Sequence, residues 1–168
     1  MTTIRVRAAH GRLRSEGFSL IELMVVVSIV ALLAGIGMPL AELSHQRSRE
    51  EDLRRALREI RGAIDAYKRL VDDGRIERAV DGSGYPPDLT VLVDGVKDAR
   101  SPTGARLYLL RTLPRDPMSA DSTAAAAMTW SLRSYSSPPT DPAPGQDVFD
   151  VHSSSRLVGI DGTPYATW

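Results

Sequence analysis

A long apolar run near the start of the chain constrains its fold more than any other feature. Residues 23–40 carry no charged side chain, and residues 18–40 span 23 positions with a single charge, Glu22. At about 1.5 Å of rise per helical residue, 23 residues reach roughly 34 Å, which is enough to cross a hydrocarbon core of about 30 Å. The sequence therefore predicts a helix over residues 18–40 that can span a membrane.

Glu22 is the unusual residue of this run. A carboxylate inside an apolar helix costs on the order of 2.5–3.5 kcal/mol at a bilayer centre, and less near a helix end. We interpret a charge at this position as a candidate functional residue. The alternative is a glutamate that lies at the membrane interface by chance.

The residues before the run set its orientation. Four arginines precede it, and by the positive-inside rule they place residues 1–17 in the cytoplasm: Arg5, Arg7, Arg12 and Arg14. An ordinary secretory signal, cut after the small residues Gly35 and Gly37, is an alternative interpretation. Such a signal requires neither an apolar run of this length nor a glutamate at its start.

The sequence turns amphipathic beyond the run. Apolar residues recur at alternating steps of four and three: Leu53, Leu57, Ile60, Ile64, Tyr67 and Val71. This spacing is typical of a helix with one apolar face, and Gly74 after two aspartates is suited to a left-handed helix cap. We expect one helix from about residue 18 to 72, with its second half buried against the chain's own domain. A coiled-coil partner is the alternative.

The remaining sequence predicts short elements. Asp88 is suited to cap a short helix through Leu92, and residues 128–133 alternate as a strand with Met128, Trp130 and Leu132 on one face. Residues 148–151 form a second strand candidate. A proline-rich loop, residues 136–145, separates the two.

The N-terminal residues resemble a known processing signal. Gly17, Phe18, Glu22 four residues further on and the apolar helix beyond resemble the class III signal of type IV pilins and of the pseudopilins of type II secretion systems. In that family a membrane-embedded prepilin peptidase cuts after the glycine and methylates the new N-terminal residue. The resemblance thus implies cleavage after Gly17, an N-methylphenylalanine at Phe18, and a role for Glu22 in assembly.

Later motifs extend the resemblance. A Tyr-Pro pair, a Leu-Pro-Arg-Asp-Pro run at 113–117, the segment 149–153 and a final Asp161-Gly162 look like the major pseudopilin of type II secretion systems. The chain departs from that pattern after Asp-Pro, where the family usually has Trp-Gly. Here Met118 and Ser119 follow, and then a long Ala-rich and Pro-rich insertion. We interpret the chain as a divergent branch.

The resemblance implies an α+β, pilin-like fold in three parts. These are a cleaved cytoplasmic leader (1–17), a transmembrane and assembly helix (18–40), and a periplasmic domain (41–168) with a small antiparallel sheet of about three strands. It implies a single-pass protein of the bacterial inner membrane that is assembled into a periplasmic pseudopilus, where it helps to drive protein export across the outer membrane. The implied partners are further copies of the chain, prepilin peptidase, other pseudopilins and inner-membrane secretion components. Without the leader the net charge is −3, so we expect no nucleic acid.

Catalysis is not expected, whereas metal binding is a candidate. The three histidines are scattered, cysteine is absent, and no nucleophile elbow, phosphate loop or His-Glu-x-x-His motif occurs. Major pseudopilins hold a calcium ion in their C-terminal loops, and calcium takes six to eight oxygen ligands. The resemblance therefore implies candidate ligands in the corresponding region: Asp141, Asp147, Asp150 and Asp161. A solvated acidic rim is the alternative.

Two other functions stay open at this point. The first is a type IV pilin subunit for adhesion or motility, although many such pilins carry paired C-terminal cysteines. The second is a signal-anchored periplasmic binding domain, which would need no processing at Gly17.

Overall fold

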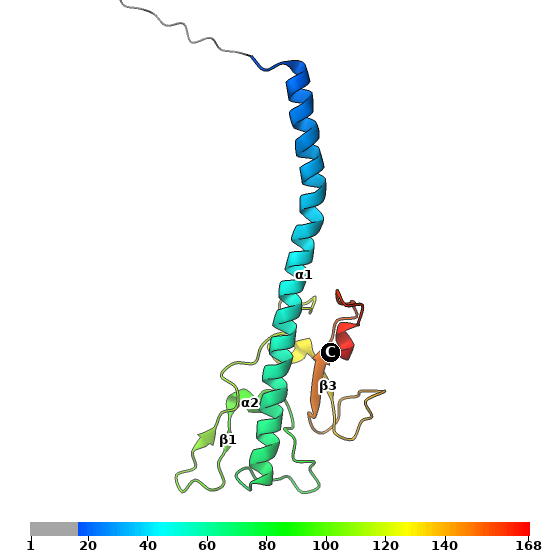
Figure 1. Ribbon diagram of the computed structural model, residues 1–168. Helices are drawn as coiled ribbons and strands as arrows, with labels where there is room; N and C mark the ends of the chain where they lie inside the picture. The colour runs from blue at the N-terminus through cyan, green and yellow to red at the C-terminus, as the bar shows by residue number, and fades with distance from the viewer. Residues whose placement is uncertain (1–16) are drawn as a thin grey trace, which may run out of the picture. The chain divides into compact units, whose positions relative to one another are not determined.

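The computed structural model describes residues 17–168, except for the side chains of residues 35–41. The chain forms two compact units, one ending at Glu42 and the other comprising Leu43–Trp168, and each is described by itself. The helix α1 (Leu20–Asp72) begins in the first unit and ends in the second (Figure 1). The long helix expected over residues 18–72 is thus confirmed as a helical element.

The end of α1 follows from Gly74. This residue has φ +66°, a left-handed conformation that glycine adopts without steric cost. The backbone N–H of Gly74 donates to the Val71 carbonyl and that of Arg75 to the Leu70 carbonyl, each at 2.9 Å. This pair of bonds is a Schellman motif, which satisfies carbonyls that the last turn leaves free.

The amphipathic stripe of α1 forms one wall of the core in the Leu43–Trp168 unit. Each predicted stripe residue is at most 8% exposed: Leu53, Leu57, Ile60, Ile64, Tyr67 and Val71. They pack with buried side chains from the rest of the unit, such as Leu92, Val151 and Tyr165. The stripe is therefore covered by the chain's own domain, as expected.

Two small antiparallel sheets accompany the helix. In the first, β1 (Val96–Lys97) pairs with β2 (Arg106–Leu107), just after the short helix α2 (Val91–Asp94). In the second, β3 (Trp130–Arg133) pairs with β4 (Asp150–Ser153). Figure 1 shows α2 and β1 at one side of the second half of α1 and β3 at the other. The α+β class is confirmed.

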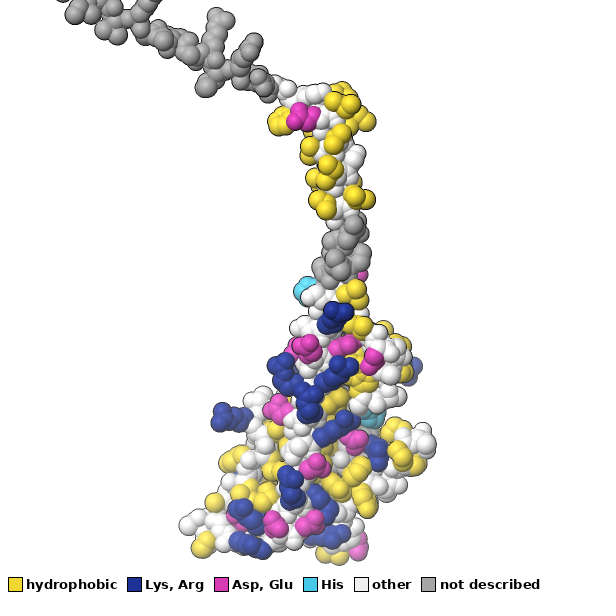
Figure 2. All heavy atoms as spheres, in the orientation of Figure 1, with side chains coloured by type: hydrophobic (Ala, Val, Ile, Leu, Met, Phe, Trp, Pro, Cys, Tyr) yellow, Lys and Arg dark blue, Asp and Glu magenta, His cyan; other side chains and the backbone are white. Residues whose placement is uncertain are grey.

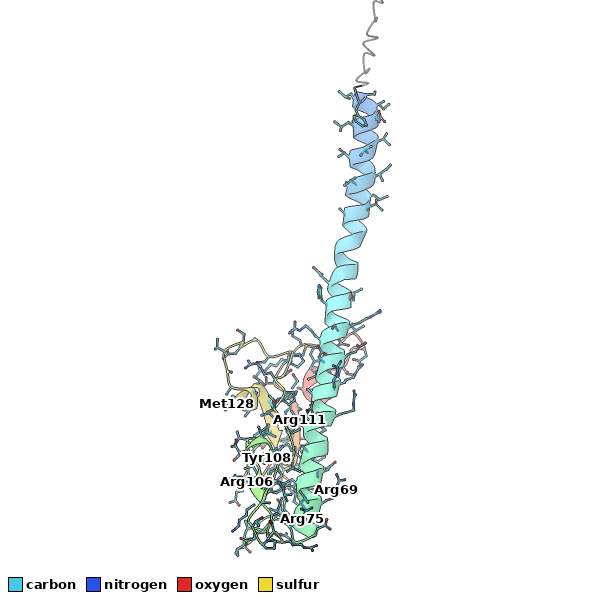
Figure 3. The ribbon with its side chains drawn as sticks, turned by 90° about the vertical axis from the view of Figure 1, so that its left-hand side faces the viewer. Arg69, Arg75, Arg106, Tyr108, Arg111 and Met128 are labelled. Atoms are coloured by element: carbon cyan, nitrogen blue, oxygen red, sulfur yellow. The ribbon has the colours of Figure 1, made fainter. Side chains whose placement is uncertain are left out.

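The expected single sheet of about three strands is wrong, because the strands form two separate sheets of two strands each. The chain before β3 coils into the 3-10 helix η1 (Ala126–Thr129), so the strand predicted from residue 128 begins at Trp130. Met128 is 78% exposed and lies at the outer edge of the domain (Figure 3), whereas Trp130 is buried. The prolines between β3 and β4 lack the N–H that a further strand would need.

Side chains join the first sheet to the end of α1. Asp88 accepts hydrogen bonds from the backbone N–H groups of Thr90 and Val91, at 2.8 and 3.0 Å, and so organises the turn before α2. Arg75, labelled in Figure 3, pairs with the buried Asp98 next to β1 at 2.5 Å. The hydrogen bond from Arg75 is the main reason that the pKa of Asp98 lies below its ordinary value.

Asp116, in the Leu-Pro-Arg-Asp-Pro corner, is a second buried carboxylate, at 3% exposed. Its side chain accepts hydrogen bonds from the Met118 N–H at 2.8 Å, from the Ser153 hydroxyl at 2.6 Å and from the Ser154 N–H at 3.2 Å. Its own N–H donates to the Thr129 hydroxyl at 3.0 Å. The corner is thereby attached to β4 and to η1, two elements distant in sequence.

Candidate functional site

The predicted processing junction lies immediately before α1. Phe18 is 81% exposed, and among the described residues outside its chain neighbours no heavy atom lies within 4 Å of where a Cβ on Gly17 would be. The first helical hydrogen bond runs from the Leu23 N–H to the Ser19 carbonyl at 3.0 Å. The junction is therefore open in the described part of the chain. The rest of the predicted leader, residues 1–16, lies outside the described residues.

Glu22 lies in the first turn of α1 and is exposed. An acidic side chain there interacts favourably with the free N–H groups of the helix start. Six residues further on, the Ser28 hydroxyl donates to the Met24 carbonyl at 2.7 Å, which satisfies that polar group within the helix itself. No other charged side chain occurs among the described residues from Gly17 to Ala34, so Glu22 is the single charge of this segment.

The helix around Glu22 is apolar on every side. Large hydrophobic residues, each 48–81% exposed, occupy consecutive positions and so all faces of the helix: Phe18, Leu20, Ile21, Leu23, Met24, Val25, Val26, Val27, Ile29, Val30, Leu32 and Leu33. In Figure 2 hydrophobic side chains cover most of the visible face of the first turns of α1. Such a helix needs an apolar environment on all sides. Among the residues that the structure describes, no helix is both long enough and apolar enough to cross a membrane.

The predicted calcium ligands serve separate local roles. Asp141 is exposed in the proline-rich loop, and Asp147 accepts hydrogen bonds from the Ser134 hydroxyl and the Tyr135 N–H, each at 2.8 Å. Burial raises the pKa of Asp147, but hydrogen bonds from Ser83, Tyr135 and Ser134 together lower it below its ordinary value. This carboxylate is therefore held in its charged form by protein donors.

The other two predicted ligands are paired with arginines of α1. Asp150 lies 2.7 Å from Nε of Arg61, and Asp161 lies 3.5 Å from a terminal nitrogen of Arg54. Asp161 also accepts hydrogen bonds from the hydroxyl and the N–H of Thr163, at 2.6 and 3.0 Å. Both bonds lower the pKa of Asp161 below its ordinary value, and the bond from the hydroxyl has the larger effect.

The structure does not bring the four aspartates together. The described residues contain no group of three or more His, Cys, Asp or Glu side chains that could hold a metal ion. As placed, these carboxylates do not fit a calcium site. Calcium binding stays a prediction, and this geometry lends it no support.

Sequence reasoning missed the residues of α1 that hold the segment 157–168. Glu50, 5% exposed, accepts hydrogen bonds from the Tyr165 hydroxyl and the Ile160 N–H, each at 2.8 Å. The guanidinium of Arg54 lies 4.2 Å from the ring centroid of Trp168. Arg61 donates to the Trp168 carbonyl at 2.8 Å.

Glu50, Arg54 and Arg61, which we call the α1 clamp, have a spacing of four and seven residues. That spacing places them on one helix face beside the apolar stripe. The same spacing was visible in the sequence. Charges flanking an apolar stripe usually face solvent, however, so the spacing alone did not indicate a partner.

Comparisons with known proteins match the start of the chain to a known motif. A long helix with an exposed apolar start, joined to small antiparallel sheets, is typical of pilin-like proteins. The family model described as the prokaryotic N-terminal methylation motif matches residues 12–38, which include Gly17, Phe18 and Glu22. No solved structure matches the chain.

The class of protein can be narrowed further. The chain is 30% identical over 112 residues to the type II secretion system core protein G of Klebsiella pneumoniae, and the match covers 64% of this chain and 72% of that protein. The chain belongs to the family of that core protein, the major pseudopilins of type II secretion systems. Among the functions that the sequence left open, this favours a structural subunit of the pseudopilus over an adhesion or motility pilin or a binding domain.

Proposed function

We propose that prepilin peptidase cleaves this pseudopilus subunit after Gly17, methylates Phe18, and so prepares it to polymerise through its apolar helix. The observation that carries the proposal is the exposed apolar surface on all sides of the start of α1. Fully burying one such side chain is worth about 1.5–3 kcal/mol. Summed over this helix, the free energy gained by burying these side chains is on the order of 10 kcal/mol or more. We therefore expect the helix to be buried in a membrane or in an assembly.

Two environments would supply that burial in turn. Before assembly, residues 18–40 would lie in the bacterial inner membrane as a single span, with the arginine-rich leader in the cytoplasm and the domain in the periplasm. After cleavage, the same surface would pack against the helices of neighbouring subunits in a periplasmic filament. The leader would prevent this transfer because its arginines tether the helix to the cytoplasmic face.

The proposed partners follow from this sequence of events. They are further copies of the chain, prepilin peptidase, other pseudopilins and the inner-membrane components of the secretion system. The growing filament would help to drive protein export across the outer membrane. In this account the chain is not an enzyme.

Glu22 would set the register between neighbouring subunits. After cleavage Phe18 carries a free amine, and this amine and the Glu22 carboxylate would be opposite charges at similar depth in a bundle of apolar helices. Pairing them between subunits offsets the desolvation cost of both and fixes the axial position of one helix against the next, a well-attested use of a buried ion pair. Glutamate in the headgroup region, with register set by apolar packing alone, is the alternative.

Substitution of Glu22 tests the proposal. We expect Glu22→Ala and Glu22→Gln to be inserted and cleaved normally but to yield few or no sheared filaments and little secretion. Ser28→Ala, which changes an exposed polar residue of the same helix, is the matched control and should assemble normally. Filaments of a Glu22 variant at wild-type yield would refute the register role.

A further inference from the structure

We infer that Arg61 supplies the cation that organises residues 150–168, so that the domain holds this region together without calcium. The inference goes beyond the proposed function and does not depend on it. The family resemblance implies a calcium ion in this region. The carboxylates of Asp147, Asp150 and Asp161, however, already accept hydrogen bonds from other side chains or backbone N–H groups.

Arg61 gathers three oxygen atoms from two distant segments. Its Nε donates to Asp150 Oδ1 at 2.7 Å, and one terminal nitrogen donates to the carbonyls of Val151 at 2.9 Å and Trp168 at 2.8 Å. These acceptors lie 89, 90 and 107 residues further along the chain. A carboxylate and two backbone carbonyls are the ligand types that calcium takes in proteins. Here the planar guanidinium, with its five N–H donors, takes them instead.

The remaining predicted ligands do not complete a metal site around this point. Asp161 is engaged by Thr163 and lies 3.5 Å from Arg54, and Asp147 is engaged by Ser134 and Tyr135. A calcium ion approaching Asp150 or Asp161 would meet a guanidinium beside each carboxylate, and like charges at such distances repel. The ion would have to displace Arg61 from Asp150, to which it donates a hydrogen bond, and would have to approach Asp161 against the charge of Arg54.

The geometry of the contact matters more than its net charge. The side chains of Arg61 and Asp150 are 38% and 30% exposed, so solvent screens their mutual attraction. The planar guanidinium of Arg61 donates to β4 and to Trp168 at the same time. A lysine ammonium, which is a point charge without this planar arrangement of donors, cannot reproduce that set of contacts. Arg61 therefore fixes the segment 157–168 on α1, together with Glu50 and Arg54 of the α1 clamp.

A calcium comparison on the wild-type protein is the first test. Full-length protein in detergent micelles is heated with millimolar calcium or with excess chelator, and unfolding is followed by the fluorescence of Trp130 and Trp168. We expect superimposable melting curves. A rise of the melting temperature by several degrees with calcium, roughly 5 °C for near-saturating ligand, would overturn the inference.

Substitution of Arg61 is the second test, with Arg58→Met as a matched control because Arg58 is an exposed arginine on the same helix. We expect Arg61→Met to lower the melting temperature by roughly 5–10 °C. Arg61→Lys should fall in between, since an ammonium keeps the charge but not the fork. An Arg61→Met protein that melts like Arg58→Met would contradict the inference. If Arg61→Met does not fold, Arg61→Lys and the calcium comparison decide. Neither test requires filaments, so a failure of the proposed assembly would not affect them.

Discussion

Removing the Asp116 carboxylate should destabilise the Leu43–Trp168 unit strongly. The carboxylate is 3% exposed and accepts three hydrogen bonds, all from neutral donors. Asp116→Ala relieves the cost of burying a charge, but it leaves the Ser153 hydroxyl and two backbone N–H groups without that acceptor. An orphaned buried donor costs about 1–3 kcal/mol. The orphaned donors outweigh the relief, and we expect a net loss of about 3 kcal/mol.

The size of this effect makes it measurable. For a unit of this length, about 3 kcal/mol lowers the melting temperature by roughly 10 °C. Urea unfolding of the full-length protein in micelles, followed by tryptophan fluorescence, gives the same loss as a shifted midpoint with an unchanged slope. Asp116→Asn keeps one oxygen acceptor, so its loss should be smaller, about 1–2 kcal/mol.

A double-mutant cycle with Ser153 tests the reasoning itself. The Ser153 hydroxyl is fully buried and donates to Asp116 at 2.6 Å. Ser153→Ala alone should cost about 1–2 kcal/mol, but in the Asp116→Ala background it should be close to neutral, because it removes a hydroxyl that has already lost its acceptor. Equal costs of Ser153→Ala in both backgrounds would refute the argument, as would an Asp116→Ala protein within about 0.5 kcal/mol of the wild type.

Two further predictions concern the core and pH. Leu53 is fully buried, so Leu53→Ala should lower the free energy of unfolding in urea by about 2–5 kcal/mol. Leu43 is 43% exposed, so Leu43→Ala should lower it by under about 1 kcal/mol. Equal losses of stability in the two variants would contradict the core assignment. Burial, followed by Arg61 and Arg133, lowers the pKa of His152 below its ordinary value despite the opposing effect of Asp150. The folded state therefore favours neutral His152. The stability that this group contributes is fully present above about pH 6.5, its unfolded pKa, and is lost progressively as the pH falls below that value towards the lowered folded pKa. His152→Gln should remove this part of the pH dependence of the melting temperature, and an unchanged pH profile would contradict it.

The helix could be predicted from the sequence because its signals are local. The apolar run, the stripe from Leu53 to Val71 and the glycine at position 74 each depend on residues within a few turns of one another. The structure bears them out in α1, in its buried face and in the φ of +66° at Gly74.

The strands and the α1 clamp could not be predicted in the same way. Residues 128 and 129 fit an alternating strand, yet the chain coils there and Met128 faces solvent. Arg61 looks like any solvent-facing charge of an amphipathic helix until residues about 90–107 positions away reach it. The acidic residues of the last third were visible in the sequence, but their hydrogen-bond donors were not.

The most direct test of the central claim is intact-mass spectrometry of a sheared filament fraction from cells that express the full chain and a prepilin peptidase. The account predicts that this chain is a principal component of the fraction and that its mass corresponds to a start at Phe18 with one added methyl group. A fraction that lacks the chain, or that contains it with Arg5 retained or with a start at Met38, would contradict the account.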